Sequence, residues 1–316
     1  MSGGRLTVLL YHRIAERRDP AFRGYRALVS ATPDGFARQM RYVARRFNVL
    51  SLDDLVAVLD GRPPPPRALV ITFDDGYADN HAHALPVLRA MGLPAILFLV
   101  TGAVGTGHVP WWDESAALIG DGPGLDAHCE ALKRLSPEAV DDRMRALRGD
   151  RRPADADGAP LFMDWHDAAS MEAGGVACQP HTHTHPVLSR ATRTQVRHEV
   201  ARSAAVIRER LGRPALAFAY PSGRAEDFGP DAVSAVAANG LRVAFSTRPG
   251  PIRLAGARAR PLEVPRVTID AGDDDVRFRL KVHGAVPWIH RARGAGGALR
   301  RGARAARQRR TANRLR

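Results

Sequence analysis

Residues 68–76 read ALVITFDDG, an apolar run that ends abruptly in two carboxylates and a glycine. A nearly continuous apolar run of this length predicts a β-strand that is covered on both faces. Asp-Asp-Gly alone is common turn chemistry. Two adjacent carboxylates at a strand end also suit a site in which one binds a cation and the other accepts a proton, because without a cation they would repel each other.

Similar runs recur along the chain, separated by amphipathic stretches. The predicted strands are Leu6–Tyr11, Asn48–Leu50, Ala68–Phe73, Ala95–Val100, Val176–Gln179, Ala215–Tyr220, Arg242–Ser246 and Val264–Ile269. Three predicted helices run from Thr32-Pro33 to about Arg46, from Ser51 to Gly61, and from Pro230 to Gly240. Two more are predicted to end at Gly92 and at Gly212. This alternation over ~250 residues predicts a parallel α/β fold, and about seven to eight strands favour a distorted (β/α) barrel over an open sheet.

Polar motifs follow four of these runs. They are Tyr11-His12, Thr72-Phe73-Asp74-Asp75-Gly76, His181-Thr182-His183-Thr184-His185-Pro186, and Tyr220-Pro221-Ser222-Gly223. The carboxyl ends of the strands of a parallel barrel converge on one face, where active sites are built. We therefore expect the four motifs to meet in space.

The three histidines within five residues favour metal binding over three unrelated side chains. His181 and His185 can point the same way if their loop turns helically, and His183 then faces elsewhere. Together with Asp75 they offer three ligands and leave one position for water, as in catalytic zinc sites. Cys178 lies inside an apolar run, so we expect a buried thiol there and not a ligand.

Two of these motifs in this order resemble the first two signature motifs of the polysaccharide deacetylases, the NodB-homology carbohydrate esterases. The matching segments are Thr72–Gly76 and His181–Pro186. Further similarity, to the bacterial branch linked to exopolysaccharide synthesis, lies in Leu9–Ile14, Trp111-Trp112-Asp113 and Phe218–Pro221. The resemblance covers roughly Leu6 to Ala285.

The resemblance implies a NodB-like barrel and metal-dependent removal of N-acetyl groups from a polysaccharide or glycolipid that contains N-acetylhexosamine. Carried over by position, Asp75, His181 and His185 hold the metal, with zinc expected, and Asp74 is the general base. The backbone N–H of Ser222 would then stabilise the oxyanion.

The sequence departs from the family pattern in its later motifs, and the late Asp-Trp motif is missing. The third motif usually holds an arginine that orients the base, and Phe218-Ala219-Tyr220 has none. Arg266 is the best substitute, and an edge-strand arginine is the alternative reading. For the general acid, His12 and His283 are rival candidates, because Leu280-Lys281-Val282-His283 is offset by one residue from the expected motif.

Composition bounds the remaining possibilities. The chain has 316 residues, 45% of them hydrophobic, and two cysteines, which excludes a disulfide scaffold. No apolar run approaches the ~20 residues of a membrane span, and the start lacks signal-peptide features. We therefore expect a cytoplasmic protein. We divide it into a barrel at residues 1–288, with an insertion at about 104–160, and a tail at residues 289–316.

The tail carries much of the positive charge. It has ten arginines and no acidic residue, so the net charge of +14 falls to 14 − 10 = +4 without it. We expect a disordered tail that contacts an anionic membrane surface at the inner face, where a lipid-linked oligosaccharide substrate would lie. A nucleic-acid partner is disfavoured because the body shows no aromatic and basic pattern for it. A carbohydrate-binding pseudo-deacetylase and an amidase for a non-sugar amide remain as alternatives.

Overall fold

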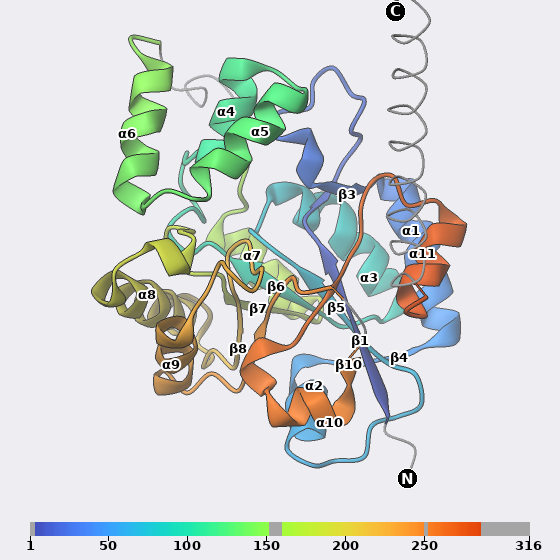
Figure 1. Cartoon of the computed structure of the whole chain (residues 1–316). Coiled ribbons are helices and arrows are strands. Elements are labelled where there is room, and N and C mark those ends of the chain that lie inside the picture. Colours follow the sequence, from blue (N-terminus) through green and yellow to red (C-terminus); the bar gives the residue numbers. More distant parts are fainter. Residues whose placement is uncertain (1–3, 152–159, 250–251, 286–316) are drawn as a thin grey trace, which may run out of the picture.

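The computed structural model describes residues 4–151, 160–249 and 252–285, and its centre is a mostly parallel sheet surrounded by helices (Figure 1). Its strands are β1 (Arg5–Tyr11), β4 (Asn48–Val49), β5 (Ala68–Phe73), β6 (Ala95–Leu99), β7 (Val176–Pro180), β10 (Ile252–Arg253) and β11 (Val267–Thr268). The order β1-β5-β6-β7 is parallel throughout, and β4 and β11 add parallel pairs to β5 and β1. The predicted α/β class is confirmed.

Two further strands, β8 (Ala217–Ala219) and β9 (Val243–Phe245), form a separate parallel pair beside β7. No backbone ladder joins β7 to β8 in the described residues. Instead, the side-chain carbonyl of Gln179 accepts hydrogen bonds from the backbone N–H groups of Leu216 and Ala217, at 2.8 and 2.9 Å. A side chain therefore links β7 to β8 where the backbone ladder is interrupted.

The other side of the barrel closes through the segment after β9. Val264 forms a parallel bridge with Phe245, and three residues later β11 pairs with β1. The predicted strands are present, although several are shorter than expected. Three elements were not predicted: the antiparallel β10 and the small parallel pair β2 (Arg13–Ile14) and β3 (Val29–Ala31).

Helices cover the sheet, and their ends follow the capping signals in the sequence. They are α1 (Pro33–Arg46), α2 (Leu52–Leu59), α3 (Leu85–Met91), α4 (Trp111–Ile119), α5 (Pro123–Leu132), α6 (Pro137–Arg148), α7 (Trp165–Ala173), α8 (Arg193–Leu211), α9 (Pro230–Ala238), α10 (Leu254–Ala259) and α11 (Asp275–Val282). The capping box of Ser51 and Asp54 opens α2, and Gly92 and Gly212 end α3 and α8 in left-handed conformations.

Alternate residues of the strands point to opposite faces and build two cores. Leu6, Val8, Val70, Ile96 and Phe98 point into the barrel, where α2 and α10 add apolar side chains. The alternate set, which includes Leu9, Leu69 and Leu97, packs outward against α1, α3 and α7. Strands buried on both faces explain the nearly continuous apolar runs of the sequence.

The insertion predicted over residues 104–160 contains α4, α5 and α6, which stand together at one end of the barrel (Figure 1). Residues 152–159 of the insertion and the predicted disordered tail lie outside the described residues. None of the helices in the described part of the chain is long and apolar enough to cross a membrane.

Candidate metal centre and its surroundings

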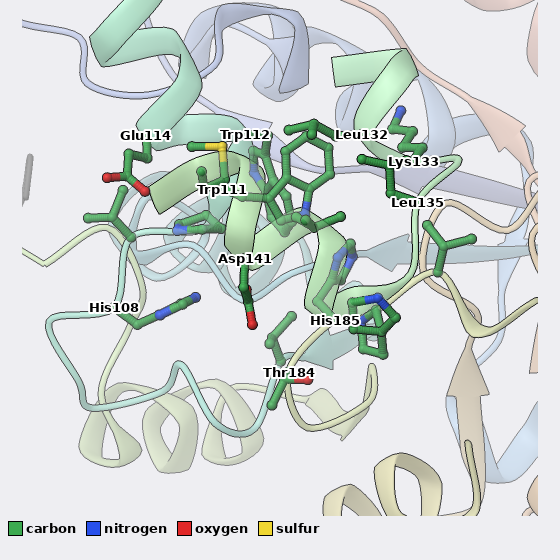
Figure 2. Close-up of a pocket in the computed structure, with 18 of the residues that line it drawn as sticks. His108, Trp111, Trp112, Glu114, Leu132, Lys133, Leu135, Asp141, Thr184 and His185 are labelled. Atoms are coloured by element: carbon green, nitrogen blue, oxygen red, sulfur yellow. The ribbon is translucent and has the colours of Figure 1, made fainter. Parts of the chain in front are cut away.

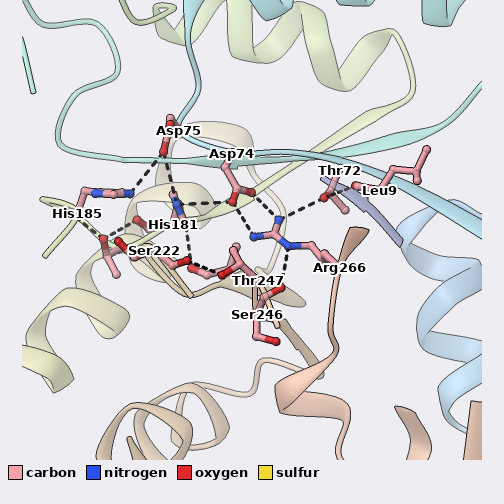
Figure 3. A network of polar contacts seen from close by, with 12 residues as sticks. Leu9, Thr72, Asp74, Asp75, His181, His185, Ser222, Ser246, Thr247 and Arg266 are labelled. Atoms are coloured by element: carbon pink, nitrogen blue, oxygen red, sulfur yellow. Dashed lines mark hydrogen bonds and ion pairs between the residues drawn. The ribbon is translucent and has the colours of Figure 1, made fainter. Parts of the chain in front are cut away.

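The motifs that follow β5, β7 and β8 meet at one end of the barrel (Figure 3). After Phe73 the chain leaves the strand with Asp75 and Gly76 at positive φ angles of 76° and 90°. Gly76 is required here, because a Cβ would lie 2.6 Å from the Leu99 side chain. The sharp turn directs both carboxylates toward the end of the barrel.

Asp75, His181 and His185 bring one ligand atom each into a common space, within 4.8 Å of one another. Asp75 Oδ1 lies 3.5 Å from His181 Nε2 and 3.4 Å from His185 Nε2. Tetrahedral zinc, with bonds of about 2.0–2.1 Å, separates its ligand atoms by roughly 3.3 Å. The spacing and the two-imidazole, one-carboxylate donor set therefore fit a divalent metal such as zinc.

The protonation of His181 also fits a metal ligand. Its Nδ1 lies 2.7 Å from the carbonyl oxygen of Ala219, and because a carbonyl only accepts, Nδ1 carries the proton. Burial lowers the pKa of His181 to about 4, although nearby Asp74 and Asp75 oppose that shift. The imidazole is thus neutral at pH 7 with the Nε2 lone pair facing Asp75.

The loop that carries both histidines has a strained backbone. Thr182 and His185 adopt positive φ angles of 66° and 64°, which L-residues rarely do. Glu199 of α8 holds the loop, because its carboxylate accepts hydrogen bonds from the N–H groups of His183 and Thr184, at 2.7 and 2.8 Å. The His183 ring turns away to Thr101, at 3.0 Å.

Arg266 lies inside the barrel at the end that carries the site, and it is fully buried. Its two terminal nitrogens lie 2.6 Å from the two carboxylate oxygens of Asp74. Burial alone would raise the pKa of Asp74, but the guanidinium, together with the nearby His181 and His12, outweighs it and keeps that pKa below its usual value. Asp74 is therefore ionised at neutral pH, with Oδ2 4.0 Å from His181 Nε2.

Two further predicted residues adjoin this cluster. Ser222 has a positive φ of 58°, and its carbonyl oxygen accepts a hydrogen bond of 2.7 Å from the Thr247 hydroxyl. The backbone N–H of Ser222 has no hydrogen-bond acceptor among the described residues. His12 follows β1, and it lies close enough to Asp74 and Asp75 to contribute to the lowering of their pKa values.

His283 lies at the opposite end of the barrel, which corrects the expectation that it could be the general acid. Its Nε2 is 2.9 Å from the hydroxyl of Tyr42, and its carbonyl accepts from Arg5, the first residue of β1. Asp74, in contrast, follows the last residue of a parallel strand. His283, whose motif is shifted by one residue from the family pattern, caps the C-terminus of α11 and does not belong to a loop of the site.

A cleft of about 470 Å³ opens beside His185, between the insertion helices and residues 184–187 (Figure 2). Its walls include Trp111, Leu135, Val140 and Met144, with Lys133 and Asp141 among the charged side chains. Both tryptophans of the pair line the cleft. Trp112 is buried and packs on the His185 ring, whereas Trp111 is only partly buried and is the more exposed of the two.

Two residues that shape the site had no local signal in the sequence. Glu199 and Gln179 lie within a helix and a strand respectively, where their side chains look like ordinary polar positions. Trp112 lies in a segment that the resemblance did mark, but its contact with His185 was not predicted. These contacts appear only when distant segments are brought together.

Comparisons with known proteins identify the family and the fold. The family model described as polysaccharide deacetylase matches residues 61–244, more than half of the chain. The chain belongs to the polysaccharide deacetylase family, as its motifs predicted. A Bacillus subtilis protein described as a putative polysaccharide deacetylase is 29% identical over 86 residues, which is 26% of this chain and 31% of that protein. The match thus spans about a third of the relative's length.

Solved structures share the fold. A Streptococcus pyogenes deacetylase in complex with acetate aligns over 89% of this chain and 99% of its own, with a TM-score of 0.63 and 18% identity. IcaB from Ammonifex degensii aligns over 89% and 97%, with a TM-score of 0.59 and 21% identity. The deacetylase domain of BpsB from Bordetella bronchiseptica aligns over 85% and 97%, with a TM-score of 0.55 and 22% identity. At these identities the likeness concerns the fold.

Proposed function

We propose that this protein is a metal-dependent carbohydrate N-deacetylase, which hydrolyses the N-acetyl groups of a glycan that contains N-acetylhexosamine. One observation carries the proposal: an ionised, buried carboxylate, Asp74, lies beside a triad of side chains, Asp75, His181 and His185, spaced as metal ligands. A protein that only binds sugar has no need of a base beside a metal. Membership of the family supports the same reaction.

The three-residue set of Asp75, His181 and His185 would hold the metal, with zinc expected from the donor types. When bound, such a metal lowers the pKa of water and polarises the acetamide carbonyl. Asp74 accepts the proton of the attacking water, and Arg266 keeps Asp74 ionised and fixes the direction of its oxygens.

The remaining steps use Ser222 and His12. The N–H of Ser222, which has no acceptor among the residues that the structure describes, donates a hydrogen bond to the acetamide oxygen as negative charge develops on it. His12 donates a proton to the nitrogen of the departing amine, so that the sugar leaves as a neutral amine with acetate as the second product. The position of His283 at the other end of the barrel supports the choice of His12 over that rival.

The substrate beyond its acetamide would occupy the cleft beside His185. We propose that the aromatic wall formed by Trp111 contacts the apolar face of a pyranose ring, with Lys133 and Asp141 near its hydroxyl groups. We propose a lipid-linked oligosaccharide at the inner face of the membrane as the substrate. Anionic lipid attracts the arginine-rich residues 289–316, which would hold the enzyme near such a substrate.

Released acetate tests the reaction. Zinc-loaded full-length protein is incubated with N-acetylglucosamine oligomers, with bacterial exopolysaccharide, and with a non-sugar acetamide of similar size. We expect acetate from a sugar substrate and a 10²–10⁴-fold lower rate for Asp74→Asn, which retains the shape of the side chain. Sugar binding without acetate release would identify a binding protein, and faster release from the non-sugar amide would identify an amidase.

A further inference from the structure

We propose that Trp112, anchored through Tyr77 and Asp113, orients the His185 imidazole as a metal ligand. This inference rests on the proposed metal site and adds positioning residues to it. Trp112 and Asp113 belong to α4, so the insertion would take part in building the metal centre as well as the cleft.

The two candidate histidine ligands are held in different ways. His181 donates its Nδ1–H to the carbonyl of Ala219, the usual type of outer contact that fixes a metal-binding imidazole. The Nδ1 of His185 has no hydrogen-bond partner among the described residues. Something else must therefore fix the rotation of that ring.

Two rings pack against it: that of His181, at a centroid distance of 4.9 Å, which is itself a candidate ligand, and that of Trp112, which lies nearer. Its ring centroid lies 4.6 Å from that of His185, with the two planes inclined by 59°. Trp112 is buried at 6% exposure, and the His185 side chain at 13%. An indole packed on one side of the imidazole limits its rotation, and a small change in that rotation displaces Nε2 from Asp75.

Trp112 is itself fixed by a chain of hydrogen bonds. The indole N–H donates to the Tyr77 hydroxyl at 2.7 Å, and that hydroxyl donates to Asp113 Oδ2 at 2.7 Å. The other oxygen of Asp113 accepts the backbone N–H of Tyr25 at 2.6 Å. All the donors have acceptors, so the chain defines one orientation for the indole.

Tyr77, the middle residue of this series of hydrogen bonds, is held by packing. The Tyr77 ring lies between Phe162, at a centroid distance of 5.0 Å, and the guanidinium of Arg13, 4.5 Å from the ring centroid. Arg13 is fixed in turn by an ion pair of 2.7 Å with Asp79. Gly24 lets the backbone approach Asp113, because a Cβ there would lie 2.5 Å from Asp113 Oδ1.

The test measures metal binding and the cobalt absorption spectrum of full-length variants, with activity as a third readout. Trp112→Leu removes the ring, Trp112→Phe keeps an aromatic face without the anchoring N–H, and Asp113→Asn weakens the far end of the anchor. Trp111→Leu is the matched control for metal affinity and the cobalt spectrum only, because Trp111 packs edge-on against Trp112 and not on a ligand, whereas its place in the substrate cleft excludes it as a control for activity.

We expect Trp112→Leu to weaken Co²⁺ and Zn²⁺ binding by about 10–100-fold, the range typical of outer contacts to a ligand, and to change the visible cobalt bands. Trp112→Phe should recover most of the affinity, and Asp113→Asn should lie between it and Trp112→Leu. Wild-type affinity and spectrum in Trp112→Leu overturn the inference. If that variant does not fold, unchanged bands and affinity in both Trp112→Phe and Asp113→Asn overturn it. A wild-type protein that binds neither metal overturns the proposed site itself.

Discussion

Arg266 and Asp74 lie 192 positions apart in the sequence and form a bidentate ion pair, in which both nitrogen–oxygen distances are 2.6 Å. The guanidinium rests over the rings of Phe98 and Phe245 and also donates to the carbonyl of Ser246. A buried carboxylate beside an arginine stays ionised, because the opposite charge compensates for the loss of water. The pair therefore fixes both the charge and the direction of Asp74.

The first prediction follows from that pair. Replacing Arg266 by methionine removes the positive charge, so the pKa of Asp74 rises and the acid limb of the pH–rate profile moves to higher pH. Arg266→Lys keeps the charge and loses the bidentate geometry, so its acid limb should move less while its turnover still falls. Rates of acetate release between pH 4 and 9 measure both effects. An acid limb that stays in place in Arg266→Met would show that another group is the base.

The second prediction concerns the metal ligands. Asp75→Ala, His181→Ala and His185→Ala each remove one of three ligand atoms, so each should weaken zinc binding by at least the 10–100-fold typical of outer contacts. His183→Ala is the matched control, since the His183 ring faces Thr101. Calorimetric titration of the metal-free proteins measures the affinity. Loss of zinc in His183→Ala with retention in His181→Ala would refute the assignment.

The third prediction separates the two candidate acids. His12→Asn should lower the rate of acetate release by about 10²–10⁴-fold, because the amine then leaves without a proton donor. His283→Asn should leave the rate unchanged, since His283 contacts Tyr42 at the far end of the barrel. Zinc affinity, measured in parallel, should be similar in both. An unimpaired His12→Asn enzyme would remove His12 from the mechanism.

The fourth prediction concerns stability and pH. Burial raises the pKa of Asp113 from 3.8 to about 6, although Arg13 and the hydrogen bond from Tyr25 oppose the shift. The folded state thus binds the proton more tightly than the unfolded state, so this group loses stability as pH rises from about 4 to about 6. The loss is about 3 kcal/mol at 1.36 kcal/mol per pKa unit.

Urea unfolding of the metal-free protein measures this effect. Asp113→Asn cannot titrate, so the free energy of unfolding of the wild type should fall relative to that of the variant between pH 3.5 and 7. The exposed Asp34→Asn is the control for loss of a carboxylate. A constant difference between wild type and Asp113→Asn across that range would contradict the prediction.

The fifth prediction concerns the arginine-rich end. Each arginine near an anionic surface contributes roughly 1 kcal/mol before screening, so a few engaged side chains suffice for binding. Full-length protein should sediment with anionic and not with neutral liposomes, and the binding should be lost at high salt. A version that ends at Ile289 should stay in solution. Equal sedimentation of the two versions would remove the membrane role.

The sequence by itself determined the class of fold, the strand ends that carry the site, and the family. These depend on local patterns: apolar runs such as Ala68–Phe73, capping residues such as Ser51, and motifs whose members lie within a few residues. Such patterns can be read from the sequence because backbone geometry and burial act on residues that are neighbours along the chain.

Only the tertiary structure decided which distant groups face each other. It paired Arg266 with Asp74, set Trp112 against His185, and removed His283 from the site. Each of these contacts joins segments that no periodicity connects, because their distance depends on how the strands close into a barrel and where the insertion packs. The Gln179 side chain bridges β7 and β8 because no backbone ladder joins these two strands in the described residues. The residues next to Gln179 in the sequence give no indication of that gap.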